Sequence, residues 1–356
     1  MTIIDTTGAF LGMPDASGTA AVPRSDTPHK AKDFASDQEV RWCPGCGDYV
    51  ILATVRGFLA ELGVRKENLM FVSGIGCSSR FPYYLDAYGI HSIHGRAPAL
   101  ATGLAVTRPD LSVWVVTGDG DALSIGGNHL IHALRRNVNL TILLFNNRIY
   151  GLTKGQYSPT SEPGKVTKST PMGSVDHPFN TLSVALGAEA TFAARALDSD
   201  RAGLTEVLRA ATAHRGTSFV EILQDCPIFN DGSFDVLRRG DSAARLIALR
   251  DGQPIVFGAD CEFAVVRSGF GLAVARTADV DEREIVVHDA RADSPEYAYA
   301  LSRLSDQDLS HVVTGVFRDV SRPTYDDAVR AQTAAAKQGR RADLQELLTG
   351  TETWTI

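Results

Sequence analysis

Long apolar runs and secretory features are both missing from this sequence of 356 residues. No stretch approaches the roughly 18 consecutive apolar residues that a transmembrane helix needs, so we expect no membrane span. Residues 1–26 have neither a basic start nor an apolar block, which argues against a secretory signal. We therefore expect a soluble, cytoplasmic protein.

Excess positive charge and a disulfide framework are also absent. The formal net charge is −7, which argues against nucleic acid as a partner. An odd number of cysteines in a long chain without a signal does not suggest paired disulfides. The five cysteines are Cys43, Cys46, Cys77, Cys226 and Cys261. Binding a metal or a cluster is the better use of two of them that stand only three positions apart.

The most informative stretch that is present covers residues 111–154. Residues 111–117 form a β-branched apolar run that stops at a Gly-Asp-Gly turn, residues 118–120. Residues 126–137 carry apolar side chains at helical spacing, and residues 140–145 form a second apolar strand. Parallel strands joined in this way open their carboxyl ends on one edge of a sheet, where ligands of α/β folds bind.

Asp119 and Asn147 follow these two strands, so we expect their oxygens to face one crevice. A carboxylate, an amide oxygen and a loop carbonyl suit Mg²⁺, which takes its other ligands from water and a bound phosphate. The glycines that would let backbone N–H groups approach that phosphate are Gly118, Gly120, Gly126 and Gly127. Taken singly, Gly-Asp-Gly is an ordinary turn and Asn-Asn an ordinary loop, and the functional interpretation depends on their combination.

Cys43 and Cys46 form a Cys-x-x-Cys turn before a helix that we expect at residues 50–62. The dipole of that helix would favour the thiolate form at its N-terminus. Two thiols on one turn can bind zinc, exchange a disulfide or hold an iron–sulfur cluster, and the turn alone leaves these three uses open.

Two further loops carry candidate site residues. A glycine-rich loop follows an expected strand at residues 69–72, and it includes Cys77 as a third thiol. Arg80 beside it could hold a substrate carboxylate, or it could be an ordinary exposed arginine. Of two alternating histidines, His94 is the better candidate for a cofactor pocket, although a lone histidine is more often an ordinary polar residue.

The remaining elements are expected to complete an α/β domain and to add a smaller lobe. We expect helices at 179–187 and 204–213, strands at 188–193 and 218–223, a hairpin at 255–276 and a helical region at 295–347. Residues 155–177 have loop composition, and long loops inside a domain are often functional. Cys226 follows the last of these strands, whereas two acidic neighbours oppose a thiolate at Cys261, to which we assign a structural role. Cys226 also has an acidic neighbour, which weakens this contrast.

Several segments together resemble the β subunits of 2-oxoacid:ferredoxin oxidoreductases, and among them the 2-oxoglutarate type. In order along the chain these segments are residues 42–49, 73–82, 94–98, 118–128 and 144–154. The resemblance implies an α/β parallel-sheet fold that binds thiamine diphosphate. We divide the chain into three regions. Residues 1–36 have the composition of an extended arm, ordered on a partner or disordered, and the resemblance does not cover them. A thiamine and iron–sulfur domain is expected at 37–235, and an extension at 236–356 that packs on the core and on a partner subunit.

The resemblance implies three cofactors, namely thiamine diphosphate, Mg²⁺ and one [4Fe–4S] cluster. Asp119, Asn147 and the carbonyl of Ile149 would hold Mg²⁺, and Arg80 and His94 are candidate catalytic residues. The cluster ligands would be Cys43, Cys46, Cys77 and Cys226, although zinc would accept the same four thiolates. The implied thiamine pocket comprises Ser73, Gly74, Ile75, Gly76, Cys77, Ser78, His94, Gly118, Asp119, Gly120, Asp121, Asn147, Gly151, Leu152 and Thr153.

The implied reaction converts 2-oxoglutarate, coenzyme A and oxidised ferredoxin into succinyl-CoA, CO₂ and reduced ferredoxin. Thiamine enzymes also need a glutamate that faces the aminopyrimidine, and this sequence has no second α/β domain to supply it. We therefore expect an α subunit that carries the pyrimidine-binding domain and this glutamate. The expected assembly is an α2β2 heterotetramer, and the chain alone should be inactive.

Three alternatives remain open at this point. A related enzyme could act on pyruvate or on a broad range of 2-oxoacids, because Arg80 would recognise only the carboxylate that these substrates share. A non-oxidative thiamine-dependent decarboxylase or synthase subunit would share the Gly-Asp-Gly and Asn-Asn pattern but would have no use for four cysteines. A zinc-stapled α/β scaffold protein would bind no thiamine at all.

Overall fold

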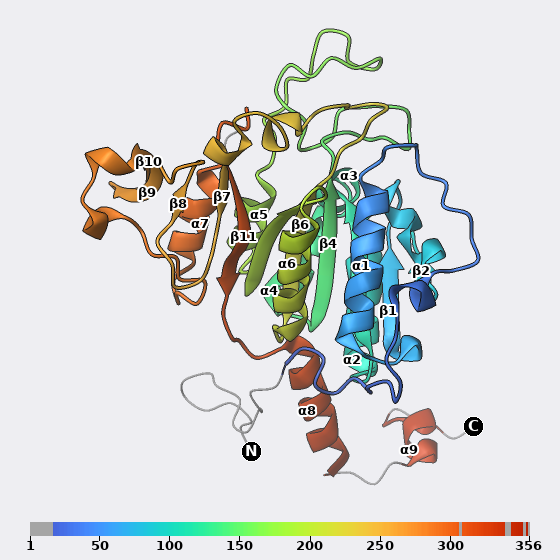
Figure 1. Ribbon diagram of the computed structural model, residues 1–356. Helices are drawn as coiled ribbons and strands as arrows, with labels where there is room; N and C mark the ends of the chain where they lie inside the picture. The colour runs from blue at the N-terminus through green and yellow to red at the C-terminus, as the bar shows by residue number, and fades with distance from the viewer. Residues whose placement is uncertain (1–16, 306–307, 339–342, 352–353, 355–356) are drawn as a thin grey trace.

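An eight-stranded sheet forms the centre of the computed structural model, which describes residues 17–305, 308–338, 343–351 and 354. Its strands are β1 (Leu69–Ser73), β2 (Tyr88–His91), β3 (Ser112–Gly118), β4 (Leu140–Asn146), β5 (Phe192–Leu197), β6 (Thr217–Leu223), β7 (Leu246–Ala248) and β11 (Val312–Asp319). The strand order is β2-β1-β3-β4-β6-β5-β11-β7, and in Figure 1 the sheet runs from β2 at the right to β7 at the left. Strands β1 to β6 pair in parallel, so the predicted parallel-sheet α/β fold is confirmed.

Helices cover both faces of this sheet (Figure 1). One face carries α1 (Asp48–Leu62) and α6 (Arg201–Ala213), and the other carries α2 (Ala97–Thr107), α4 (Gly127–Arg136) and α5 (Thr181–Gly187). Alternate residues of β3 and β4 enter the two cores, so both strands are buried throughout and appear in the sequence as continuous apolar runs. The strand–helix–strand unit predicted at residues 111–145 is therefore confirmed.

The carboxyl ends of the parallel strands all open on one edge of the sheet. The short helix α3 (Asp119–Leu123) begins there directly after β3, and the sequence did not predict it. Residues 151–180 cross above the same edge as a long excursion without helix or strand, at the top of Figure 1. This confirms the predicted loop at residues 155–177 and places it over the edge where ligands are expected.

The C-terminal part differs from its predicted helical character. Helices α7 (Pro295–Arg303), α8 (Tyr325–Gln338) and α9 (Leu344–Thr349) are present, but β11 lies between α7 and α8 and joins the main sheet beside β5. Gly315 has a positive φ of 101°, and the pairing register shifts between Val316 and Arg318. These two irregularities interrupt the alternation by which a strand is recognised in a sequence.

Two smaller expectations have different outcomes. The strand expected at residues 188–193 is displaced, because β5 starts only at Phe192. The hairpin expected at residues 255–276 is confirmed by a separate three-stranded sheet. Its strands are β8 (Val256–Phe257), β9 (Phe263–Ser268) and β10 (Gly271–Arg276).

The N-terminal segment lies on this chain's own core. Val22 and Phe34 are buried, and the N–H of Gly18 donates to the carbonyl of Ala213 at 3.2 Å. The expectation that the arm is ordered only against a partner is therefore wrong for residues 17–36, while residues 1–16 of the predicted arm lie outside the described part. Of the helices in the described ranges, none has the length and apolarity that crossing a membrane requires.

Candidate functional site

A pocket lies at the carboxyl ends of β1, β3 and β4, between three loops that the sequence singled out. Its lining residues are Ile75, Gly76, Cys77, Ser78, His94, Gly118, Asp119, Gly120, Asp121, Phe145, Asn147, Ile149, Tyr150, Gly151, Leu152 and Thr153. The fold thus brings together most of the predicted cofactor residues. Ser73 and Gly74 are not among these lining residues, and neither is Arg80.

Asp119 stands at the start of α3 and is 3% exposed. Its Oδ2 accepts hydrogen bonds from the hydroxyls of Ser158, at 2.5 Å, and Thr160, at 2.6 Å. Burial raises the pKa of Asp119 to about 6, although the two hydroxyls act to lower it. The side chain is therefore a carboxylate near neutral pH and is held rigidly enough to serve as a metal ligand.

The two consecutive asparagines after β4 point to different places. The Oδ1 of Asn147 accepts from the N–H of Ile149 at 3.2 Å, and Asn147 lines the pocket with Asp119. The side chain of Asn146 is buried behind the pocket, where its Nδ2 donates to Glu221 at 2.7 Å. The second asparagine, not the first, is therefore placed to act as a ligand beside Asp119 and the carbonyl of Ile149.

Asp121 joins the loops that form the pocket. Its Oδ1 accepts hydrogen bonds from the backbone N–H groups of Ile75, at 3.1 Å, and Gly95, at 2.8 Å, and lies 2.6 Å from Nδ1 of His94. Its Oδ2 accepts from the hydroxyl of Thr117 at 2.7 Å. Groups of the protein itself therefore bind both oxygens of this buried carboxylate. The contact with Oδ1 also fixes the ring of His94 at the pocket, with Nδ1 facing Asp121.

Two glycines are required here by the protein's own packing. A Cβ atom on Gly74 would lie 1.9 Å from Oδ2 of Asp121, and one on Gly120 would lie 2.1 Å from the ring of Tyr150. Tyr150 also donates its hydroxyl to the carbonyl of Gly120 at 3.1 Å. Gly120 was expected to let the backbone approach a phosphate, but the close neighbour at this position is a side chain of the same chain.

Four of the five cysteines come from three separate segments that the fold ties together. The indole N–H of Trp42 donates to the carbonyl of Cys77 at 2.7 Å, and the N–H of Gly47 donates to the carbonyl of Asp225 at 3.2 Å. A Cβ atom on Gly151 would lie 3.6 Å from the sulfurs of both Cys77 and Cys226. The thiols of Cys77 and Cys226 are therefore close together, beside a residue that also lines the pocket.

The electrostatics of the thiols agree with this convergence. When ionised, Cys77 and Cys226 each raise the pKa of Cys46, and Cys43 raises the pKa of both Cys77 and Cys226. Burial raises the pKa of Cys77 to about 12 and that of Cys46 well above its usual range, and Asp48 adds to both shifts. The expected thiolate-favouring effect of the α1 dipole is therefore outweighed at Cys46, which is neutral unless a cation binds it. Cys261 is exposed on the turn between β8 and β9 and is not one of these interacting thiols.

Arg80 and Ser73 do not reach the pocket. Arg80 lies in a 3₁₀ turn (Ser78–Tyr84), where its Nη1 donates to the carbonyl of Arg41 at 3.1 Å and its charge lowers the pKa of Cys77. The hydroxyl of Ser73 donates to the carbonyl of Ser79 at 2.7 Å. Ser73 therefore shapes the loop, and Arg80 stands beside the thiols.

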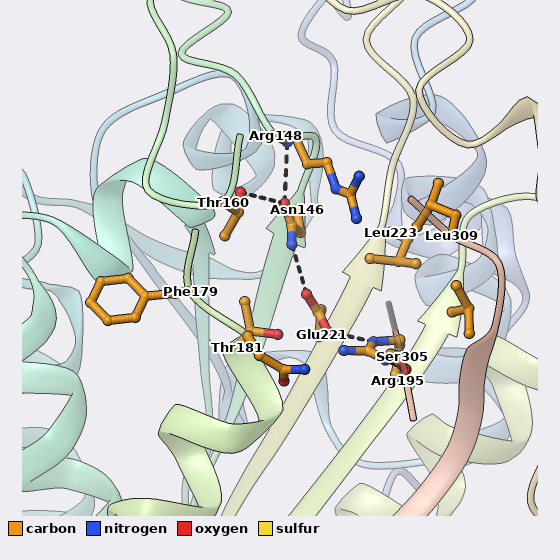
Figure 2. Close-up of a pocket in the computed structure, with 12 residues that line it drawn as sticks. Asn146, Arg148, Thr160, Phe179, Thr181, Arg195, Glu221, Leu223, Ser305 and Leu309 are labelled. Atoms are coloured by element: carbon orange, nitrogen blue, oxygen red, sulfur yellow. Dashed lines mark hydrogen bonds and ion pairs between the residues drawn. The ribbon is translucent and has the colours of Figure 1, made fainter. Parts of the chain in front are cut away.

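Sequence patterns missed a buried polar network behind the pocket, which Figure 2 shows. The hydroxyl of Thr160 lies 2.6 Å from Oδ2 of Asp119 and 2.9 Å from Oδ1 of Asn146. Asn146 in turn donates to Glu221, which pairs with Arg195 at 2.6 Å. Burial alone would raise the pKa of Glu221, but the Arg195 charge and hydrogen bonds to the carboxylate hold it below its usual value. The sequence offered one sign of this network, namely a charged residue, Glu221, within a mostly apolar strand.

Comparison with known proteins decides the family. Residues 74–222 match the thiamine pyrophosphate enzyme family, C-terminal TPP binding domain. The chain is 71% identical to the 2-oxoglutarate oxidoreductase subunit KorB of Mycobacterium tuberculosis, over 99% of this chain and 95% of that protein. The chain belongs to the 2-oxoacid:ferredoxin oxidoreductase β subunits.

Two more distant relatives agree with this family assignment. The chain is 44% identical to the 2-oxoacid:ferredoxin oxidoreductase 2 β subunit of Aeropyrum pernix, over 56% of this chain and 64% of that one. A solved structure, 2-oxoglutarate:ferredoxin oxidoreductase from Magnetococcus marinus with 2-oxoglutarate, coenzyme A and succinyl-CoA bound, matches with a TM-score of 0.75 and 34% identity. That match covers 93% of this chain and 100% of the other. The predicted family and the thiamine-diphosphate-binding fold are thus confirmed, and the match to the thiamine domain spans every lining residue of the pocket.

The donor sets in this β subunit fit the predicted groups. A buried carboxylate, an amide oxygen and a carbonyl converge at one pocket, and four thiols gather beside it. Within the described residues, no three His, Cys, Asp or Glu side chains are arranged to hold a single metal ion. Neither predicted set is of that kind, since the magnesium set has only one carboxylate and four thiols around a cluster surround several atoms.

Proposed function

We propose that this chain, with an α subunit, forms a 2-oxoglutarate:ferredoxin oxidoreductase. The complex would convert 2-oxoglutarate and coenzyme A into succinyl-CoA and CO₂ and pass two electrons to ferredoxin. The observation that carries this proposal is that Cys77 lines a thiamine-type pocket and that Cys226 lies near it, both sulfurs being 3.6 Å from a Cβ atom built on Gly151. Cys43 and Cys46 interact electrostatically with these two thiols. A non-oxidative thiamine enzyme would have no use for thiols at this place.

In the proposed holoenzyme, Asp119, Asn147 and the carbonyl of Ile149 hold Mg²⁺ against the diphosphate. Cys43, Cys46, Cys77 and Cys226 hold one [4Fe–4S] cluster, for which four thiolates are a suitable ligand set. When bound, thiamine diphosphate supplies the nucleophilic carbon and the electron sink for decarboxylation, and the cluster supplies a one-electron acceptor.

This chain's own residues contribute positioning and charge. Ser158 and Thr160 hold the Asp119 carboxylate toward the pocket. Asp121 fixes the loops that carry Ile75 and His94, and it orients His94 so that Nε2 is the ring nitrogen left for the pocket. Arg80, next to Cys77 and outside the pocket, is the candidate for a substrate carboxylate that approaches from the side of the thiols.

The α subunit is proposed to supply the pyrimidine-binding domain and the glutamate that activates thiamine. We further propose an α2β2 assembly, a separate ferredoxin as the electron acceptor and a cytoplasmic location. The relatives named as 2-oxoacid:ferredoxin oxidoreductases favour a second candidate with the same chemistry and a broader range of 2-oxoacids, pyruvate among them.

An anaerobic comparison of the purified chain with the reconstituted α/β complex tests the proposal. Both samples should show a broad visible band that dithionite bleaches, and only the complex should reduce ferredoxin with 2-oxoglutarate and coenzyme A. Turnover by the β chain alone would contradict the need for an α subunit. A colourless protein with stoichiometric zinc would contradict the cluster, and equal kcat/KM for pyruvate and 2-oxoglutarate would favour the broader specificity.

A further inference from the structure

Gln224 lies between the two candidate sites and contacts a proposed ligand of each. It directly follows β6, is 1% exposed, and donates its backbone N–H to the carbonyl of Asn146 at 2.9 Å. Its Nε2 lies 3.3 Å from the sulfur of Cys46, and its Oε1 accepts from Nδ2 of Asn147 at 2.9 Å. One buried amide therefore connects the thiol site to the oxygen-lined pocket.

Backbone groups determine which way both amides face. The Nε2 of Gln224 also donates to the carbonyl of Asp225, which can only accept, so nitrogen must occupy that position. The Oδ1 of Asn147 accepts from the N–H of Ile149, which can only donate, so oxygen must occupy that position. In the hydrogen bond between the two side chains, Asn147 is therefore the donor and Gln224 the acceptor, and the two backbone groups fix this direction.

For Asn147, the contact with Gln224 decides which atom the pocket receives. An amide nitrogen cannot ligate Mg²⁺, whereas an amide oxygen can. Because Oε1 of Gln224 holds the NH₂ group, a flip of Asn147 would place two oxygens against each other. Gln224 therefore keeps the oxygen of Asn147 available on the side of Ile149 and Asp119.

For Cys46, the contact supplies a hydrogen-bond donor to a buried sulfur. Nε2 of Gln224 lies 3.3 Å from Sγ, and both residues are buried. An N–H group directed at a ligand sulfur stabilises negative charge there, and it stabilises the reduced state of a cluster more than the oxidised state. The contact should therefore make reduction of a bound cluster easier.

We propose that Gln224 is a positioning residue shared by the two cofactor sites. It presents the oxygen of Asn147 to Mg²⁺ and raises the reduction potential of the cluster through Cys46. This inference rests on the proposed function, because it assumes that both groups bind, and it assigns to one side chain the task of setting both sites.

Two substitutions separate the two contacts. Gln224→Met has similar volume and removes both, whereas Gln224→Glu keeps an oxygen to accept from Asn147. The carboxylic acid has one hydrogen where the amide has two, and the carbonyl of Asp225 would take it, so Cys46 loses its donor. The matched control is Asn68→Leu, which removes a buried amide that donates to the carbonyl of Asp110 at 2.9 Å, at the opposite edge of the sheet.

The measurements use the anaerobic α/β complex. The cluster midpoint potential is followed by EPR in a redox titration, and Mg²⁺ affinity is measured by calorimetry with thiamine diphosphate present. We expect a more negative potential in both Gln224 variants, and a Mg²⁺ affinity about 10- to 100-fold weaker in Gln224→Met alone. Asn68→Leu should change neither quantity, because it lies far from both sites.

The possible results are distinguishable. A wild-type complex without a cluster or without thiamine binding would refute the proposed function and this inference with it. A wild-type complex with both groups, and a Gln224→Met variant with unchanged potential and Mg²⁺ affinity, would refute the inference alone. If the cluster midpoint potential shifts equally in Asn68→Leu, the shift comes from general destabilisation. That result would also refute the role of Gln224 as a positioning residue.

Discussion

The oxygen-lined pocket and the thiol site share one edge of the sheet, yet the protein supports them in opposite ways. In the pocket, both Asp119 and Asp121 already accept hydrogen bonds from protein donors. At the thiol site, burial and the Asp48 carboxylate raise the pKa of Cys46 and Cys77. The pocket is organised before any ligand arrives, whereas Cys46 and Cys77 need a bound cation to become thiolates.

This difference leads to a general expectation. A preorganised pocket should keep its shape and its affinity when the neighbouring site is damaged. A site whose buried thiols are neutral without metal should no longer bind its cluster when a single ligand is removed. Substitutions that affect one site and spare the other therefore test the comparison directly.

The largest expected effect is at the thiols. Cys226→Ser should abolish the visible band and ferredoxin reduction, because one ligand in four is lost and the fifth cysteine, Cys261, lies on the turn between β8 and β9. Thiamine diphosphate should still bind with its wild-type affinity, measured by calorimetry in the presence of Mg²⁺. Cys261→Ser is the control, since that thiol is exposed on the small sheet, and it should leave the band intact. Loss of thiamine binding in Cys226→Ser would show that the two sites are not independent.

The converse substitution is Asp119→Asn. It should abolish Mg²⁺-dependent binding of thiamine diphosphate, because the single carboxylate in the proposed magnesium set becomes a neutral amide. The visible band and its bleaching by dithionite should remain. A protein that binds thiamine diphosphate as tightly as before would contradict the assignment of Asp119 as a metal ligand.

Local features of the sequence were sufficient to predict the oxygen-lined pocket in outline. Asp119 and Asn147 each follow an apolar strand, and the β–α–β rule places the ends of such strands on one edge. The set of four cysteines came from the resemblance to a family, and the comparisons confirm the family. The approach of Cys77 and Cys226 at Gly151 depends on loops from separate segments and is not visible in spacing alone.

What could not be predicted depends on contacts between distant segments. Ser158 and Thr160 reach Asp119 from an irregular loop, and Gln224 contacts Cys46 across 178 positions of sequence. Strand β11 was missed because Gly315 and a register shift interrupt its alternation. Arg80 was expected to hold a substrate carboxylate, and its place outside the lining of the pocket, in the 3₁₀ turn that follows Cys77, could not be predicted.

A smaller effect is expected behind the pocket, at the buried pair of Glu221 and Arg195 in Figure 2. Glu221→Gln leaves the Arg195 charge buried without its counter-ion, which should lower the free energy of unfolding by about 3–5 kcal/mol in urea titrations. The exposed pair of Arg209 and Glu61 is the control, and Arg209→Ala should cost less than about 1 kcal/mol. Equal losses in the two variants would contradict a supporting role for the buried pair.

The smallest effect that we expect concerns one hydroxyl. Ser158→Ala removes one of the two donors to Oδ2 of Asp119 and leaves Thr160 in place. Thr160 has a single hydrogen, which is already one of the two donors to Oδ2, so it cannot supply the second. We expect Mg²⁺ affinity to fall about 10-fold, as for other residues that orient a metal ligand. Ser174→Ala is the matched control, because that buried hydroxyl of the same loop donates to the carbonyl of Glu162 at 3.0 Å. If both serine variants weaken Mg²⁺ equally, the loop acts on the pocket through its overall shape, and the pocket is less preorganised than the comparison with the thiol site requires.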